Sequence, residues 1–86
     1  MRADKAKVLR LLRTAAGQIE GVIRMVEEDR YCMDISNQLL ATQSILKKTN
    51  RMVLKAHLDS CVREAAGHDS LDKVLEELAA VLDKLD

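Results

Sequence analysis

The chain has 86 residues with no proline, three glycines and one aromatic residue, and 48% of its residues are hydrophobic and 33% charged. This composition favours one small helical domain over sheets, and no segment approaches the roughly 18 consecutive apolar residues of a membrane-spanning helix. We therefore expect a single cytoplasmic domain over residues 1–86, without membrane contact. A core this small rarely contributes more than about 3–5 kcal/mol of stability, so self-association is expected.

The net charge is zero, but the charges are unevenly distributed. Residues 1–63 carry 12 Lys and Arg against 7 Asp and Glu, whereas residues 64–86 carry 2 against 7. Because a nucleic acid responds to local rather than average charge, the neutral total does not exclude DNA as a partner. The sequence predicts a basic body followed by an acidic segment.

The first predicted helix spans residues 4–28, where apolar residues recur three and four positions apart. These residues are Val8, Leu9, Leu12, Ala15, Ala16, Ile19, Val22, Ile23 and Val26. The acidic run at 27–29 is unfavourable at a helix C-terminus and favourable near an N-terminus. Asp29 is therefore predicted to cap the next helix.

The second predicted helix is continuous over residues 31–64, because residues 32–64 contain neither glycine nor proline and apolar residues occur throughout. One chain cannot cover all the apolar positions of so long a helix. We expect two protomers to form an antiparallel dimer resembling a four-helix bundle. A third helix is predicted over residues 70–85, after a stop at Gly67 and a cap at Asp69 or Ser70.

A cysteine and a histidine share one face of the second helix. His57 and Cys61 are four positions apart, so both side chains can reach one ion. Cys32 lies 29 positions before Cys61. Around the axis of a continuous helix the two side chains differ in direction by only about 20°, but along the axis they are about 43 Å apart. Two antiparallel copies of the helix, crossing near Ile45 and Leu46, bring the three residues together. The sequence thus predicts two identical intersubunit sites.

Two thiolates and one imidazole form a soft set of three ligands, which favours Cu(I). Cys32 also lies in the first turn of a helix, where free N–H groups stabilise a thiolate, so a persulfide or thiol-redox sensor using Cys32 and Cys61 is an alternative. A third hypothesis is a metal carrier or a helical module that never binds DNA. An enzyme is not expected, because the chain has no motif for a general acid, a general base or a catalytic cofactor.

Basic residues form a stripe on each of the first two helices. Arg10, Arg13 and Arg24 fall within about 60° of one another, and the group from Lys47 to Lys55 falls within about 100°. No helix-turn-helix or zinc-finger signature is present, so any DNA contact is expected from these helical faces. The predicted contacts are Arg10, Arg13, Gln18, Lys47, Lys48 and Arg51.

The segments GQIEG at 17–21, RMVEEDRYCMDI at 24–35 and HLDSCV at 57–62 resemble the copper-sensitive operon repressor (CsoR) family over nearly the whole chain. The resemblance implies an all-helical dimer that assembles into a tetramer, binds operator DNA when metal-free and releases it when the ligand binds. It also implies trigonal Cu(I) coordination by Cys32 of one protomer with His57 and Cys61 of another. Tyr31 and Glu77 match positions that link the second nitrogen of the histidine to the third helix.

Related sensors differ at the ligand positions. Nickel-sensing relatives use an N-terminal histidine and have a histidine in place of Cys61. Formaldehyde-sensing relatives use an N-terminal proline and lack the second cysteine. Arg2 and Ala3 of this chain match neither pattern. Persulfide sensors keep both cysteines but generally lose the histidine, so His57 favours the copper branch. Residues 11–16 depart from the family's arginine-rich pattern, and among the expected DNA contacts the resemblance is closest at Lys48 and Arg51.

Overall fold

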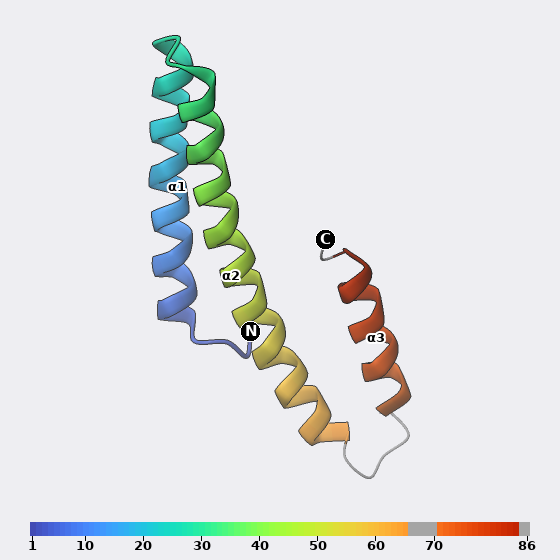
Figure 1. The fold of residues 1–86 in the computed structure, drawn as a ribbon. Coiled ribbons are helices and arrows are strands. Elements are labelled where there is room, and N and C mark those ends of the chain that lie inside the picture. The colour runs from blue at the N-terminus through green and yellow to red at the C-terminus, as the bar shows by residue number, and fades with distance from the viewer. Residues whose placement is uncertain (66–70, 85–86) are drawn as a thin grey trace.

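The structure is a computed structural model that describes residues 1–65 and 71–84. Three helices, α1 (Lys5–Glu27), α2 (Cys32–Ala65) and α3 (Leu71–Lys84), make up the fold, and the described residues contain no strand (Figure 1). The predicted all-α class with three helices is confirmed. The bounds of α1 and α3 lie within the predicted ranges, and α2 is displaced by one residue. The predicted stop and caps at Gly67, Asp69 and Ser70 lie outside the described residues.

Asp4 determines where α1 begins. Its backbone is extended, and its side-chain Oδ1 accepts hydrogen bonds from the amides of Ala6 at 3.0 Å and Lys7 at 3.3 Å. These are two of the four amides that lack a partner at any helix start. The cap therefore fixes the first turn of α1, which carries Lys7.

The prediction that Asp29 caps α2 is wrong, because Asp29 instead terminates α1. Its φ of 53° is left-handed. The amides of Asp29 and Arg30 donate to carbonyls in the last turn of α1, at 3.1 and 2.9 Å, which is the Schellman arrangement. Aspartate is among the non-glycine residues that best tolerate this conformation. The carbonyl of Tyr31 accepts the first hydrogen bonds of α2.

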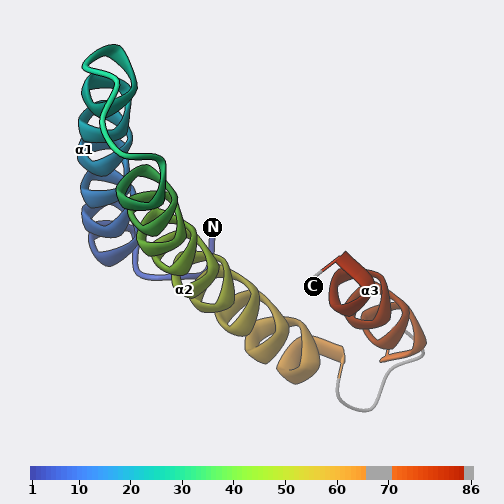
Figure 2. The ribbon, with the colours of Figure 1, turned by 45° about the horizontal axis from the view of Figure 1, so that its top comes forward.

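The helices α1 and α2 lie side by side and antiparallel over the length of α1 (Figures 1 and 2). Buried positions recur every seven residues on both helices, as in a coiled coil. They are Val8, Ala15 and Val22 on α1, and Thr42 and Thr49 on α2. We refer to these five positions as the α1/α2 seam. Both buried threonine hydroxyls in this seam are hydrogen-bonded.

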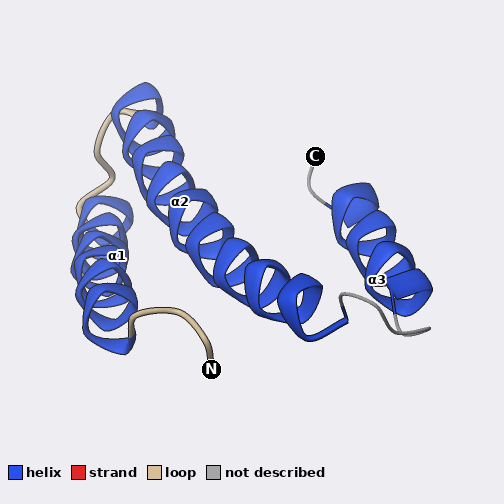
Figure 3. Cartoon of the chain, turned by 90° about the horizontal axis from the view of Figure 1, so that it is seen from below, coloured by secondary structure: helices blue, strands red, loops and turns tan. Residues whose placement is uncertain are grey.

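The described part of the chain forms a single layer of helices, with principal extents of 57 × 27 × 13 Å. α3 packs against α2 and makes no contact with α1, as Figures 1 and 3 show for the described residues. No large side chain among these residues is fully buried. Exposed large apolar residues on α1 and α2 include Leu12, Ile19, Ile23, Val26, Leu39, Leu40 and Leu46. Such an exposed apolar face favours association with another surface.

The apolar residues of α2 are spread around its circumference, whereas those of α1 and α3 gather on one side. A helix with apolar residues all round is normally covered on more than one face. None of the three described helices combines the length and low charge needed to cross a membrane.

Candidate metal centre and nucleic-acid interface

His57 and Cys61 lie one turn apart near the C-terminal end of α2. The Sγ atom of Cys61 is 3.4 Å from Nε2 and 3.9 Å from Nδ1 of His57. A nitrogen and a sulfur bound to one zinc-like ion, at about 2.0 and 2.3 Å, lie about 3.5–3.8 Å apart. The observed separations are close to this range, so the pair fits a shared metal ion without a large movement of either side chain.

Glu77 of α3 holds the imidazole of His57 in place. The His57 Nε2 lies 2.7 Å from Oε1 of Glu77, and both side chains are about half exposed. Because an ionised carboxylate only accepts hydrogen bonds, Nε2 donates its hydrogen to Glu77. Although Cys61 lies nearer to Nε2, Nδ1 is therefore the nitrogen that can offer a lone pair to a metal.

Cys32 is the first residue of α2 and is exposed, whereas Cys61 is half-buried; both thiols are free. Because α2 is continuous, Cys32 and Cys61 are separated by about 43 Å along its axis. Tyr31 adjoins Cys32 and is exposed at the same end. Within residues 1–65 and 71–84, no three Cys, His, Asp or Glu side chains of one chain are placed to hold an ion. The structure thus brings His57, Cys61 and Glu77 together and leaves Cys32 and Tyr31 at the far end.

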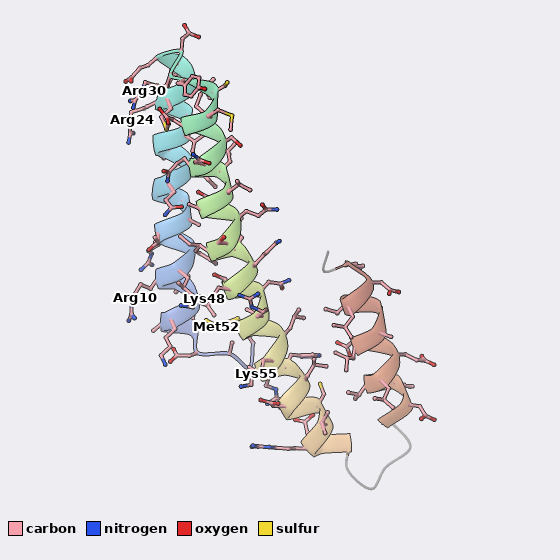
Figure 4. All side chains as sticks on the ribbon, in the orientation of Figure 1. Arg10, Arg24, Arg30, Lys48, Met52 and Lys55 are labelled. Atoms are coloured by element: carbon pink, nitrogen blue, oxygen red, sulfur yellow. The ribbon has the colours of Figure 1, made fainter. Side chains whose placement is uncertain are left out.

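A basic groove lies between the first turns of α1 and the middle of α2. Its lining consists of Lys7, Arg10, Leu11, Lys48 and Met52, without an acidic residue. Figure 4 labels three of these residues, Arg10, Lys48 and Met52. For none of the three cations in the lining does the described part of the chain supply a carboxylate within 4 Å. Sequence reasoning predicted Arg10 and Lys48 but missed Lys7. Its position three residues before Arg10, on the same side of the helix, was the available signal.

The other predicted DNA contacts lie outside this groove. Arg13 lines a neighbouring hollow together with Arg10, and Lys47 and Arg51 are exposed on α2. Gln18 is half-buried, and its Oε1 accepts a hydrogen bond from the Thr42 hydroxyl at 2.7 Å. The carbonyl oxygen of Gln18 is thus used within the protomer, which leaves its amide nitrogen for any partner.

The acidic segment lies away from the basic groove. α3 carries four acidic residues against two lysines and lies on the opposite side of α2 from α1 (Figures 1 and 2). The acidic residues are Asp72, Glu76, Glu77 and Asp83. The separation of charge predicted from the sequence is therefore also a separation in space, so α3 does not neutralise the groove.

A family model described as "metal-sensitive transcriptional repressor" matches residues 4–84, which include the groove, His57, Cys61 and Glu77. The chain belongs to this family. The family resemblance seen in the sequence is confirmed. The family consists of transcriptional repressors, which are not enzymes, in agreement with the sequence prediction.

The curated relatives of the chain include several copper sensors. It is 40% identical over 76 residues to the copper-sensing transcriptional repressor CsoR of Mycobacterium ulcerans (strain Agy99), an alignment covering 84% of this chain and 65% of that protein. The chain thus spans less than two thirds of that relative's length. The copper-sensing transcriptional repressor RicR of Mycobacterium tuberculosis (strain ATCC 25618 / H37Rv) is 36% identical, with 95% of this chain and 88% of RicR covered.

Two solved structures share the fold. The copper-sensing repressor CsoR with Cu(I) from Geobacillus thermodenitrificans NG80-2 superposes with a TM-score of 0.85 at 32% identity, covering 99% of this chain and 92% of that one. The nickel-responsive transcriptional regulator InrS gives a TM-score of 0.82 at 30% identity, covering 98% and 94%. Since sensors of different metals share this fold, the metal has to be argued from the ligand residues.

Proposed function

We propose that this protein is a Cu(I)-responsive transcriptional repressor that binds operator DNA when metal-free and releases it when Cu(I) binds. The observation that carries the proposal is the His57 and Cys61 pair, in which Glu77 occupies one imidazole nitrogen and leaves the other for a metal. Thiolate and imidazole ligands suit Cu(I). The copper-sensing relatives and the Cu(I)-containing structure of similar fold support the same choice.

The third ligand in this proposal is Cys32 of a second protomer. Cys32, Leu39 and Leu46 recur at seven-residue intervals, so they share one face of α2 with His57 and Cys61. Leu39 and Leu46 are 51% and 43% exposed, and an antiparallel second copy of α2 would cover them. The same pairing places Cys32 opposite His57 and Cys61. The functional unit is then a dimer with two equivalent sites, and such dimers associate into a tetramer.

DNA binding is assigned to the basic surface of α1 and α2. The groove cations Arg10 and Lys48 have no acidic partner within the described residues, so they are available to phosphates. Arg13, Lys47 and Arg51 extend this surface, and Gln18 adds its amide nitrogen. Cu(I) binding between subunits shifts the assembly towards a form with lower DNA affinity, and by linkage DNA lowers the affinity for Cu(I) by the same factor.

A titration of the reduced protein with Cu(I) tests the proposal. Binding to DNA from upstream of its own gene is followed by fluorescence anisotropy, and bound copper is measured in parallel. We expect one Cu(I) per protomer and release of the DNA. His57→Ala should weaken Cu(I) binding, whereas Met33→Leu, which removes the exposed sulfur beside Cys32, should not. Unchanged copper affinity and DNA release in His57→Ala would refute the proposal.

A second candidate function is persulfide or thiol-redox sensing through the same cysteines. The specific observation is that both thiols are free, with Cys32 exposed at the start of α2. An oxidant would accept two electrons and two protons as Cys32 joins Cys61 of another protomer in a disulfide. Mass spectrometry after persulfide treatment distinguishes the two functions. An unmodified protein excludes this candidate, and a copper-independent crosslink that releases DNA favours it.

A further inference from the structure

The segment that precedes α1, residues 1–4, crosses from the start of α1 towards α2, and we refer to it as the N-terminal strap (Figure 1). Ala3 in this segment is only 9% exposed. Arg2 lines a hollow on α2 whose other lining residues are Ala56, Asp59, Ser60, Arg63 and Glu64. The strap thus covers part of α2 that α1 does not reach.

An ion pair holds the strap against α2. Nη2 of Arg2 donates to Oε1 of Glu64 at 2.8 Å, which joins residues 62 positions apart in the sequence. The Ser60 hydroxyl lies 3.4 Å from the same oxygen. Because Ser60 adjoins Cys61, the strap is attached to the turn of α2 that carries the candidate metal ligands.

The other end of the strap is the cap of α1. Asp4 bonds the amides of Ala6 and Lys7, so the strap runs directly into the turn that presents Lys7 to the basic groove. On another face of the same part of α2, Glu77 of α3 bonds His57. The end of α2 that carries His57 and Cys61 therefore contacts both the strap and α3. Of these two, only the strap continues into α1.

We propose that the N-terminal strap couples the metal-binding end of α2 to the DNA-binding end of α1, with Arg2 and Glu64 as the positioning residues. This inference rests on the proposed function. A displacement of the Cys61 turn on metal binding moves Glu64, and through Arg2 and Asp4 it shifts Lys7 and Arg10 in the groove. Breaking the ion pair weakens the dependence of DNA affinity on copper while each ligand still binds.

The experiment compares the DNA affinity of each variant with and without Cu(I). The variants are Arg2→Ala, Glu64→Gln and the charge exchange Arg2→Glu with Glu64→Arg. Exposed ion pairs contribute little, so we expect each single variant to reduce the ratio of the two affinities by about two- to five-fold. The charge exchange should restore the ratio. Lys5→Ala, which removes a nearby exposed charge, should leave it unchanged. A loss that the exchange does not restore overturns the proposal, because Arg2 then acts on DNA directly.

A second measurement does not depend on copper. Amide hydrogen exchange of Ala6 and Lys7 reports on the capped first turn of α1, and we expect it to be about two- to five-fold faster in Arg2→Ala and Glu64→Gln. Circular dichroism verifies that the variants remain helical. If the unaltered protein does not respond to Cu(I), the proposed function fails, and the exchange rates still decide whether the strap holds α1. Unchanged exchange in both single variants overturns the strap proposal.

Discussion

At the scale of single residues, the hydrogen bond between His57 and Glu77 determines which imidazole nitrogen can bind a metal. An exposed histidine on a helix ordinarily presents both nitrogens to water. His57 donates from Nε2 to Glu77, which fixes the tautomer and directs the remaining lone pair from Nδ1. The four-residue spacing of His57 and Cys61 predicts that they can share an ion. Spacing cannot predict Glu77, because it is 20 positions away on another helix; only the family resemblance indicated it.

We expect Glu77→Gln to weaken Cu(I) binding by about 10- to 100-fold, because the loss of a carboxylate behind a ligating histidine lowers the basicity of the imidazole and loosens its orientation. Competition with a chelator of known Cu(I) affinity measures the change. The matched control is Glu76→Gln, which removes the same charge one position earlier, where the side chain points about 100° away around α3. Equal losses in the two variants would show that only the total charge of α3 matters.

Gln18 is predicted to contact DNA, and within the protomer its side chain accepts a hydrogen bond from Thr42. Thr42→Val removes the hydroxyl that donates to Gln18 in the α1/α2 seam, and we expect the free energy of unfolding to fall by about 1 kcal/mol because the half-buried amide oxygen loses its partner. Urea denaturation at one protein concentration measures it. Thr14→Val is the control, since its hydroxyl bonds only the Arg10 carbonyl on an exposed helix surface. A loss no larger than that of the control would mean that this hydrogen bond does not stabilise the seam.

At the scale of elements, the ends of the helices were harder to predict than the helices themselves. The turn between α1 and α2 requires a left-handed residue, and Asp29 occupies that position with a φ of 53°. The acidic run at 27–29 led to the wrong prediction that Asp29 caps α2. The preference of acidic residues for a helix N-terminus contributes only about 0.3–1 kcal/mol at an exposed site. The two hydrogen bonds that the amides of Asp29 and Arg30 donate to terminal carbonyls of α1 contribute more.

Asp29→Gly should raise the free energy of unfolding by about 0.5–1 kcal/mol, because glycine adopts a positive φ without the steric cost borne by a side chain. Thermal and urea denaturation measure the change. Ala16→Gly, at an exposed position within α1, should lower the stability by about 1 kcal/mol and serves as the opposite control. If Asp29→Gly destabilises the protein, the aspartate side chain contributes more to the turn than the backbone conformation costs.

The sequence predicts this fold well where the information is periodic and local. Apolar spacing gives the three helices, and residue spacing gives the His57 and Cys61 pair. It predicts poorly what depends on the packing of distant segments. Lys7 and Arg10 line one groove with Lys48 only because α1 packs against α2, and Arg2 meets Glu64 across 62 positions without any local signal.

At the scale of the whole molecule, the described part of the chain is a layer one helix thick with apolar residues on its surface. Its smallest extent is 13 Å, and buried hydrophobic residues are few and mostly small. In the proposed assembly, a protomer that buries so little gains its stability on association, and we therefore expect its melting temperature to depend on protein concentration. The proposed metal site should have the same dependence, because its proposed third ligand, Cys32, belongs to another chain.

Leu46→Glu tests this assembly at the centre of the proposed antiparallel contact. Near the twofold axis each copy of residue 46 faces the other, so the substitution buries two like charges, and we expect the dimer dissociation constant to rise by about 100-fold or more. Analytical ultracentrifugation measures it. Ser44→Glu places the same charge about 200° around α2 and should leave the constant nearly unchanged. Because Cys32 reaches His57 and Cys61 only across this contact, Leu46→Glu should also weaken Cu(I) binding. Intact dimers in Leu46→Glu would place the subunit contact on another face and separate it from the metal site.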